Sequence, residues 1–110
     1  MAALDRRAIR ERFRAAVNMD AGALAAWLGT EESNRVGWKT NGGESVGHAS
    51  GRRIVQILGT AEPELDEEDY RHMRRVAGFV ARHLAQAPAN IVTSRWRHSL
   101  MNWGHDPLKE

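Results

Sequence analysis

The sequence predicts an all-α fold of about five helices arranged around one long central helix. Apolar residues recur every three or four positions in several segments, which is the spacing of a helix with one buried face. Glycine, proline and helix-capping residues separate these segments. The 110 residues are 42% hydrophobic and 27% charged, a composition typical of one ordinary globular domain. We therefore expect residues 1–110 to form a single helical domain.

The composition also argues against several classes of protein. No apolar run approaches the ~20 residues that cross a bilayer, and the opening residues MAALDRRAIRERFR lack the apolar region of a signal peptide. The sequence contains no cysteine, which removes disulfides, thiolate metal sites and cysteine nucleophiles. We expect a cytoplasmic protein that does not enter a membrane and carries no cofactor.

The first predicted helix spans residues 4–17 and buries Ile9, Phe13 and Val17 on one face. Beside this apolar stripe, three arginines with i, i+3, i+7 spacing share a face. They are Arg7, Arg10 and Arg14. Such a row suits contact with a phosphate backbone. The alternative is a solvated face on which the arginines pair with Asp5 and Glu11.

A second helix is predicted at residues 21–28, after the capping residues Asn18 and Asp20. Residues 29–51 differ in character because they contain six glycines together with threonine, asparagine and serine. An irregular loop of this length is unusual in a compact domain. We expect it to be the main irregular segment, with helix beginning again near Glu44 or at Ser50.

An anion site is predicted where the next helix begins. If Ser50 caps that helix, free backbone N–H groups and the positive end of the helix dipole meet Arg52 and Arg53. The alternative is that Gly47 and Gly51 permit close helix packing while both arginines are solvated.

The longest predicted helix spans residues 66–87 and should be the central packing element. Its acidic first turn complements the helix dipole and needs no metal to explain it. Its other surface carries Arg71, Arg75 and Arg82 on one side. A separate edge combines two histidines and a phenylalanine, and either stacks on a base or is covered by the rest of the fold. The residues of that edge are His72, Phe79 and His83.

A last helix is predicted near the C-terminus, capped by Thr93 or Ser94 and ended by Gly104. Its tryptophans, Trp96 and Trp103, are typical of core anchors. Two arginines project around this tryptophan stripe and suit phosphate contact. They are Arg95 and Arg97.

Charge is unevenly distributed along the chain. The formal net charge is only +2, but 14 of the 16 basic residues are arginine, which favours bidentate phosphate or carboxylate contacts. Six acidic residues lie within residues 62–69 and leave the remainder strongly basic. A general preference for arginine over lysine explains the count equally well.

Three runs of the sequence resemble one known family. They are ESVGHASGRRIVQIL at residues 44–58, HMRRVAGFVARHLAQ at 72–86 and WRHSLMNWGHDPLK at 96–109. All three are similar to the family called domain of unknown function 3140. The resemblance implies a shared helical fold and, through a DNA-binding label carried by some members, DNA binding. It implies no catalytic residues, and the stretch GWKTNGG at 37–43 has no counterpart in it.

The function that we expect is DNA binding with little or no sequence specificity, through phosphate contacts. The contacts are assigned to Arg7, Arg10, Arg14, Arg52, Arg53, Arg95 and Arg97. The alternative is a protein-interaction module or homodimer whose basic faces pair with residues 62–69 of another copy. Neither an enzyme nor a metal site is expected, because no nucleophile elbow, H-E-x-x-H motif or orienting carboxylate accompanies Ser45, His48 or the other histidines.

Overall fold

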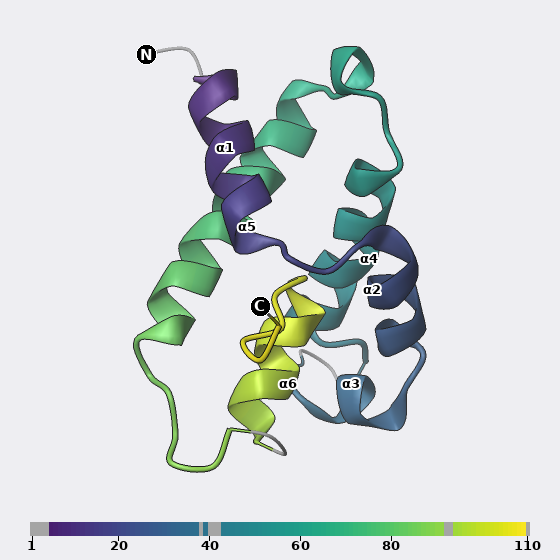
Figure 1. Cartoon of the computed structure of the whole chain (residues 1–110). Coiled ribbons are helices and arrows are strands. Elements are labelled where there is room, and N and C mark those ends of the chain that lie inside the picture. The colour runs from purple at the N-terminus through teal and green to yellow at the C-terminus, as the bar shows by residue number, and fades with distance from the viewer. Residues whose placement is uncertain (1–4, 38, 40–42, 92–93, 110) are drawn as a thin grey trace.

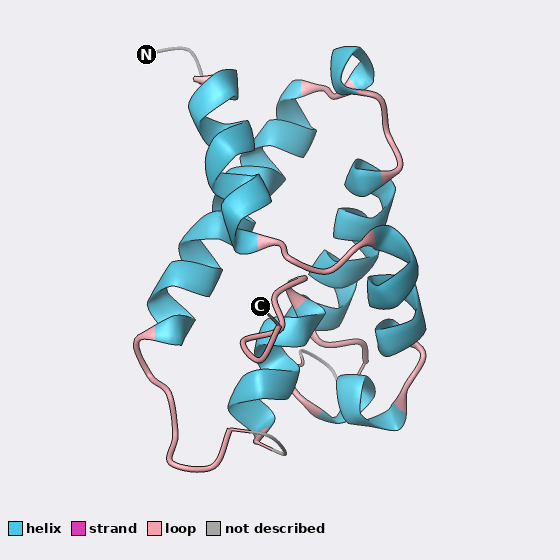
Figure 2. Ribbon diagram, in the orientation of Figure 1, coloured by secondary structure: helices cyan, strands magenta, loops and turns pink. Residues whose placement is uncertain are grey.

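The computed structural model describes residues 5–37, 39, 43–91 and 94–109. The protein is all-helical over these residues, as the sequence predicts, and contains no β-strand there (Figures 1 and 2). The elements in order are α1 (Arg6–Ala16), α2 (Ala21–Leu28), α3 (Glu31–Arg35), α4 (Val46–Leu58), the 3-10 turn η1 (Glu62–Glu64), α5 (Glu67–Leu84) and α6 (Arg95–Asn102).

Two helical pairs, one connecting helix and the short helix α3 make up the fold of the described residues. Helix α1 packs along α5, and α2 packs along α4 (Figure 1). Helix α6 contacts α2, α3, α4 and α5, and so joins the two pairs. The longest helix is α5, with 18 residues, and it contacts α1, α4 and α6.

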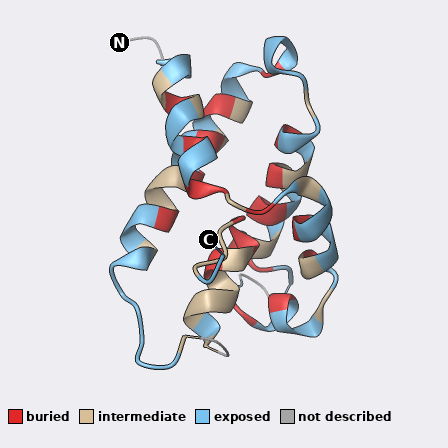
Figure 3. Ribbon diagram, viewed as in Figure 1, coloured by how far each residue is buried: buried red, intermediate tan, exposed pale blue. Residues whose placement is uncertain are grey.

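The core lies where the helices face one another, and Figure 3 shows the buried positions along these inward faces. Leu24, Ile54, Val76 and Leu100 have no exposed surface and come from α2, α4, α5 and α6 respectively. Each of these four helices therefore contributes a fully buried aliphatic side chain to one core, the arrangement that the helical spacing predicts.

The acidic residues at the start of α5 act as a cap. Asp66 accepts a hydrogen bond from the Asp69 N–H at 2.8 Å, and Asp69 accepts one from the Asp66 N–H at 3.0 Å. This reciprocal pair satisfies two donors that a helix start leaves free. Helix α5 ends at Leu84, before the predicted residue 87, and Pro88 lacks the N–H that would bond the Leu84 carbonyl in a continued helix.

The prediction that residues 29–51 are the main irregular segment was wrong where α3 forms, while the helix expected from near Glu44 is confirmed as α4, which begins at Val46. Thr30 caps α3, and Ser45 caps α4 by accepting the His48 N–H at 3.0 Å. Both caps are residue types that favour helix starts, and tertiary packing stabilises the short helices that follow. Most of the GWKTNGG stretch lies outside the described residues, as do residue 4 of the predicted first helix and Thr93.

The prediction that Ser50 starts a helix was also wrong. Ser50 lies inside α4, is 4% exposed, and places its Oγ 2.9 Å from Nε2 of His72. The helix continues N-terminal to it because Gly47 and Gly51 let α4 approach its neighbours closely. A Cβ on Gly51 would lie 2.5 Å from the Asn102 carbonyl oxygen of α6. The anion site predicted from Ser50, Arg52 and Arg53 is therefore not formed.

Candidate anion-binding surface

The arginine row on α1 is largely paired with acidic residues of the same chain. Arg7 pairs with Glu11 at 3.3 Å along the helix, while Arg10 and Arg14 both reach Glu62 of η1, at 3.3 and 3.6 Å. Arg10 also donates to the Tyr70 hydroxyl at 3.1 Å. The row thus faces part of the acidic segment, so its positive charge is partly cancelled within the fold.

The two arginines of α4 are paired as well. Arg52 donates from Nε and Nη2 to the carboxylate of Glu44, at 2.7 and 2.5 Å, and Arg53 donates to Asp69 at 3.0 Å. The hydrogen bond from Arg52 is the main reason why the pKa of Glu44 falls to about 2, with His48 adding to the effect. Both arginines therefore tie α4 to neighbouring acidic groups.

The arginines of α6 have different roles. Arg97 pairs with Asp106 at 3.2 Å, which ties α6 to the C-terminal segment. Arg95 donates to the backbone carbonyl of Arg35 at 3.1 Å and has no acidic partner among the described residues. Of the seven predicted phosphate contacts, only Arg95 keeps its charge unpaired in the described part of the chain. Their role in DNA binding stays a prediction.

The predicted aromatic edge of α5 is covered by α6. Phe79 stacks on Trp103 with ring centroids 4.2 Å apart and on His83 at 4.9 Å. His83 in turn lies 6.4 Å from Trp96, and His72 the same distance from Trp103. Burial lowers the pKa of both histidines. The edge therefore forms an interface between two helices of the fold, which was the alternative explanation.

The arginines without an acidic partner gather mainly on α5 and on the adjoining surface of α1. Among the described residues, six arginines form no ion pair. They are Arg6, Arg12, Arg74, Arg75, Arg82 and Arg95. Arg74, Arg75 and Arg82 are exposed on α5, and at 3.6 residues per turn they lie within about 100° of helix arc. We call these three residues the α5 arginine face.

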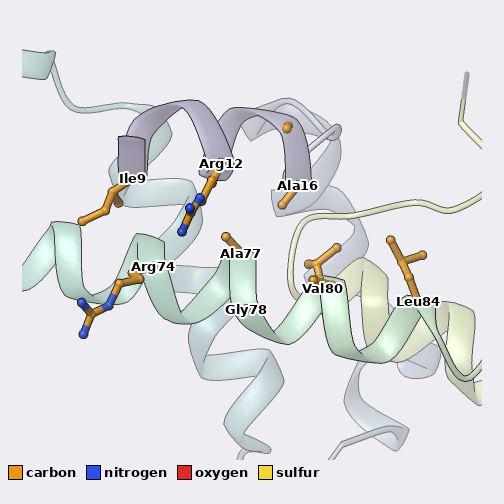
Figure 4. A pocket seen from close by; sticks show the side chains of 10 residues that line it. Ile9, Arg12, Ala16, Arg74, Ala77, Gly78, Val80 and Leu84 are labelled. Atoms are coloured by element: carbon orange, nitrogen blue, oxygen red, sulfur yellow. The ribbon is translucent and has the colours of Figure 1, made fainter. Parts of the chain in front are cut away.

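Helix α1 adds a fourth free arginine across a shallow groove. The groove of about 540 Å³ lies between α1 and α5, with small apolar residues including Ala16, Ala77 and Gly78 along it. Figure 4 shows Arg12 reaching into this region from α1 and Arg74 projecting from α5. Arg12 and Arg74 both line this groove, from α1 and α5 respectively.

A sequence signal marks this surface. No aspartate or glutamate occurs from Tyr70 to His105, although six arginines do. In the short arginine rows of α1, α4 and α6, by contrast, acidic residues elsewhere in the chain pair with most of the arginines. A long acid-free stretch covering most of one helix is the stronger indicator, because within α5 only Arg71, one turn after Glu67, then finds an acidic neighbour on the same helix.

Ser45 and His48 are held by hydrogen bonds to other groups. Ser45 Oγ receives the backbone N–H of His48, while the imidazole contacts the Glu44 carboxylate through Nδ1 and the Leu28 carbonyl through Nε2, the latter at 2.7 Å. The histidine is thus turned away from the serine hydroxyl. Within the described ranges, no group of three or more His, Asp or Glu residues could hold a metal ion. None of the described helices is long and apolar enough to cross a membrane.

The fold and this surface define a class: small all-helical proteins with unpaired arginines along their longest helix. The family model for DUF3140, described as "Protein of unknown function", matches residues 12–101, more than four-fifths of the chain. The protein belongs to this family. No curated protein and no solved structure matches it.

Proposed function

We propose that the protein binds DNA through phosphate contacts made by the α5 arginine face, with Arg12 adding a contact from α1. The observation that carries this proposal is the segregation of unpaired arginines. Arg74, Arg75 and Arg82 have no acidic partner among the described residues, whereas most of the other arginines are paired. A guanidinium group that forms no ion pair within the protein can bind a phosphate without first losing such a pair.

The dimensions of α5 fit such a contact. From Arg74 to Arg82 the helix rises about 12 Å, so the α5 arginine face can meet more than one phosphate of a backbone. Arginine contacts of this kind position a protein on DNA but do not read its sequence. The proposal therefore specifies weak or absent sequence preference.

The test compares two triple variants that lose the same charge. Arg74→Gln, Arg75→Gln and Arg82→Gln remove the proposed contacts, while Arg7→Gln, Arg14→Gln and Arg35→Gln remove exposed arginines that are paired. Binding to a labelled duplex is measured by fluorescence anisotropy over a range of salt concentrations. We expect the first triple to reduce the slope of log K against log salt by about 2 to 3 and the second by less than about 1.

Two results would contradict the proposal. The wild-type protein could fail to bind duplex DNA at low salt, or both triples could weaken binding equally, which would indicate only a general effect of net charge. Far-UV circular dichroism of each variant shows that it remains folded.

The alternative of a homodimer that pairs basic faces with residues 62–69 has less support. Glu62 is held by Arg10 and Arg14, and Asp69 by Arg53, so part of the acidic segment is engaged within the chain. Concentration-dependent mass in the absence of DNA, measured by sedimentation, would favour this alternative.

A further inference from the structure

Two residues of the α5 arginine face also line a crevice between the start of α4 and the helices α5 and α6. The crevice has a volume of about 420 Å³. The lining residues that matter here are Gly47, Arg75, Phe79, Arg82, Ser99 and Trp103. We call it the α4 crevice. None of its lining residues is acidic, and its polar side chains are those of arginine, serine and tryptophan.

Trp103 places an unsatisfied donor in this crevice. Its side chain is largely buried, at 5% exposure, but its indole N–H has no acceptor among the described residues. The indoles of Trp27 and Trp96 instead donate to Asn102 Oδ1 at 2.8 Å and to the His83 carbonyl at 2.6 Å. The Nε1 atom itself is not enclosed, since the described side-chain nitrogen that is both buried and without a partner is His83 Nε2. The Trp103 indole donor is therefore open to a ligand that enters the crevice.

The indole nitrogen of Trp103 lies against the start of α4. A Cβ built on Gly47 would lie 2.8 Å from Nε1 of Trp103, so only glycine leaves room for the indole nitrogen there. Gly47 is the second residue of the 13-residue helix α4, and its backbone N–H has no acceptor in the described chain, because the Ser45 cap bonds the N–H of His48. The positive end of the helix dipole adds to both donors.

Two guanidinium groups complete the donor set. Arg75 and Arg82 both line the crevice. They lie seven residues apart on α5, with Phe79 between them in the sequence. Neither has an acidic partner in the described ranges. The Ser99 hydroxyl also lines the crevice and makes no hydrogen bond with described residues. Glu44 precedes the α4 cap, but Arg52 and His48 hold its carboxylate.

We propose that the α4 crevice binds a phosphate monoester. The Gly47 and Trp103 N–H groups would donate to its oxygens, and Arg75 and Arg82 would balance its charge. The donors lie beside a tryptophan that is nearly buried, so a terminal phosphate reaches them more easily than a diester flanked by two sugars. This site goes beyond the duplex contact of the proposed function, although the two share Arg75 and Arg82.

The first test uses the indole N–H signals of the full-length protein. Inorganic phosphate, and separately thymidine 5′-monophosphate, is titrated at constant ionic strength, with sodium chloride as the reference electrolyte. We expect a saturable shift of the Trp103 indole signal and much smaller shifts of the Trp27 and Trp96 signals, whose N–H groups are already bonded. Loss of a signal in Trp103→Phe assigns it.

Variants then test the donors one at a time by calorimetry. Trp103→Phe retains an aromatic ring against Phe79 but removes the N–H, and we expect monophosphate binding to weaken about tenfold or more. Arg82→Gln should have a similar effect. The matched control is Arg71→Gln on the same helix, which removes an arginine paired with Glu67 at 2.5 Å and should change affinity less than about twofold. If the Trp103→Phe variant does not fold, the double variant Arg75→Gln, Arg82→Gln replaces it in the calorimetric test, because both arginines are exposed on α5.

The outcomes separate this site from the proposed function. No saturable Trp103 shift up to about 10 mM of either phosphate probe, or an equal shift with chloride, would overturn the crevice proposal. So would unchanged affinity when both Arg75 and Arg82 are replaced. If the monophosphate binds but duplex DNA does not, the crevice proposal holds and the proposed function fails. If duplex DNA binds and the Trp103 signal does not shift with either phosphate probe, the proposed function holds and the crevice proposal fails.

Discussion

Asn102 shows how one polar side chain organises three helices. It has no exposed surface, and its Oδ1 accepts hydrogen bonds from Trp27 Nε1 at 2.8 Å and Ser33 Oγ at 2.5 Å. Its Nδ2 donates to the Ser33 carbonyl at 3.0 Å. Because buried polar groups are costly unless paired, this network fixes α2 and α3 against α6 at one register. The same network provides an acceptor for the indole N–H of Trp27. The indole N–H of Trp103 has no acceptor among the described residues.

Glu44 makes the stability of the protein depend on pH. Its pKa is lowered from 4.5 to about 2, chiefly by Arg52, so the folded protein holds this carboxylate more acidic than the unfolded chain does. The resulting stabilisation is present above pH 4.5 and is lost as the pH falls through about 2. We expect Glu44→Gln to lower the free energy of unfolding by about 1 kcal/mol at pH 6, a value discounted because Arg52 is largely exposed, and by almost nothing at pH 2.

Urea unfolding of the variant and wild type at both pH values measures this difference. Glu31→Gln is the matched control, because Glu31 forms an exposed pair with Arg35 and should contribute little at either pH. A Glu44→Gln effect that stays constant down to pH 2 would disprove the assignment.

At the scale of helices, close approach decides where α4 lies. A Cβ on Gly51 would meet the Asn102 carbonyl oxygen of α6 at 2.5 Å and Leu28 Cδ2 of α2 at 2.7 Å. Both contacts are too short for a carbon atom to occupy without movement of the neighbouring helix. Gly47 has the corresponding place one turn earlier, against Trp103. The glycines of α4 thus allow three helices to pack at short distances.

Replacing Gly51 by alanine should therefore destabilise the protein although alanine favours helix. We expect overpacking to cost about 1 to 3 kcal/mol, which exceeds the gain of about 1 kcal/mol in helix propensity. Gly22→Ala in α2 should have the opposite sign, because its Cβ would meet only Asp20 Oδ1 at an ordinary 3.5 Å. Thermal unfolding of both variants distinguishes them, and equal shifts in Tm would refute this account.

At the scale of the whole molecule, the C-terminal segment closes the fold against the connection between α1 and α2. The Gly104 carbonyl accepts the N–H groups of Asn18 and Met19, each at 3.1 Å. The Asn18 side chain exchanges two hydrogen bonds with the backbone of Asp106, and the ring of His105 contacts the Ala16 carbonyl. Residues 88 positions apart in the sequence are thereby held together.

Removal of residues 105–110 should consequently weaken the entire fold. We expect the free energy of unfolding to fall by about 2 to 4 kcal/mol, because the Asn18 amide and the Arg97 guanidinium lose their Asp106 partner. Amide hydrogen exchange should rise in α1 and α6 together. Removal of residues 109–110 alone is the control: it loses the Lys109 contact with the Asn18 carbonyl but keeps Asp106, and should have a smaller effect. Faster exchange confined to α6 would contradict this coupling.

The helical class and most of the helices follow from the sequence alone. Local signals determine them: apolar spacing, the Asp20 and Asp66 caps, Pro88 beyond α5 and Gly104 after α6. The family is likewise evident in the sequence, since its model matches residues 12–101. Such features depend on neighbouring residues along the chain, so no tertiary contact is needed to recognise them.

Tertiary structure decided which individual arginines outside the acid-free stretch are paired, and which of the two expected starts of α4 is used. Arg10 finds Glu62, and Arg53 finds Asp69, across distances that no local spacing describes. The Ser45 and Ser50 positions are both acceptable caps by residue type, and the packing of Gly47 and Gly51 against α6 selects the first. Ion pairs such as these and the close packing of helices form between residues that are distant in the sequence. Local spacing of residues therefore does not predict them.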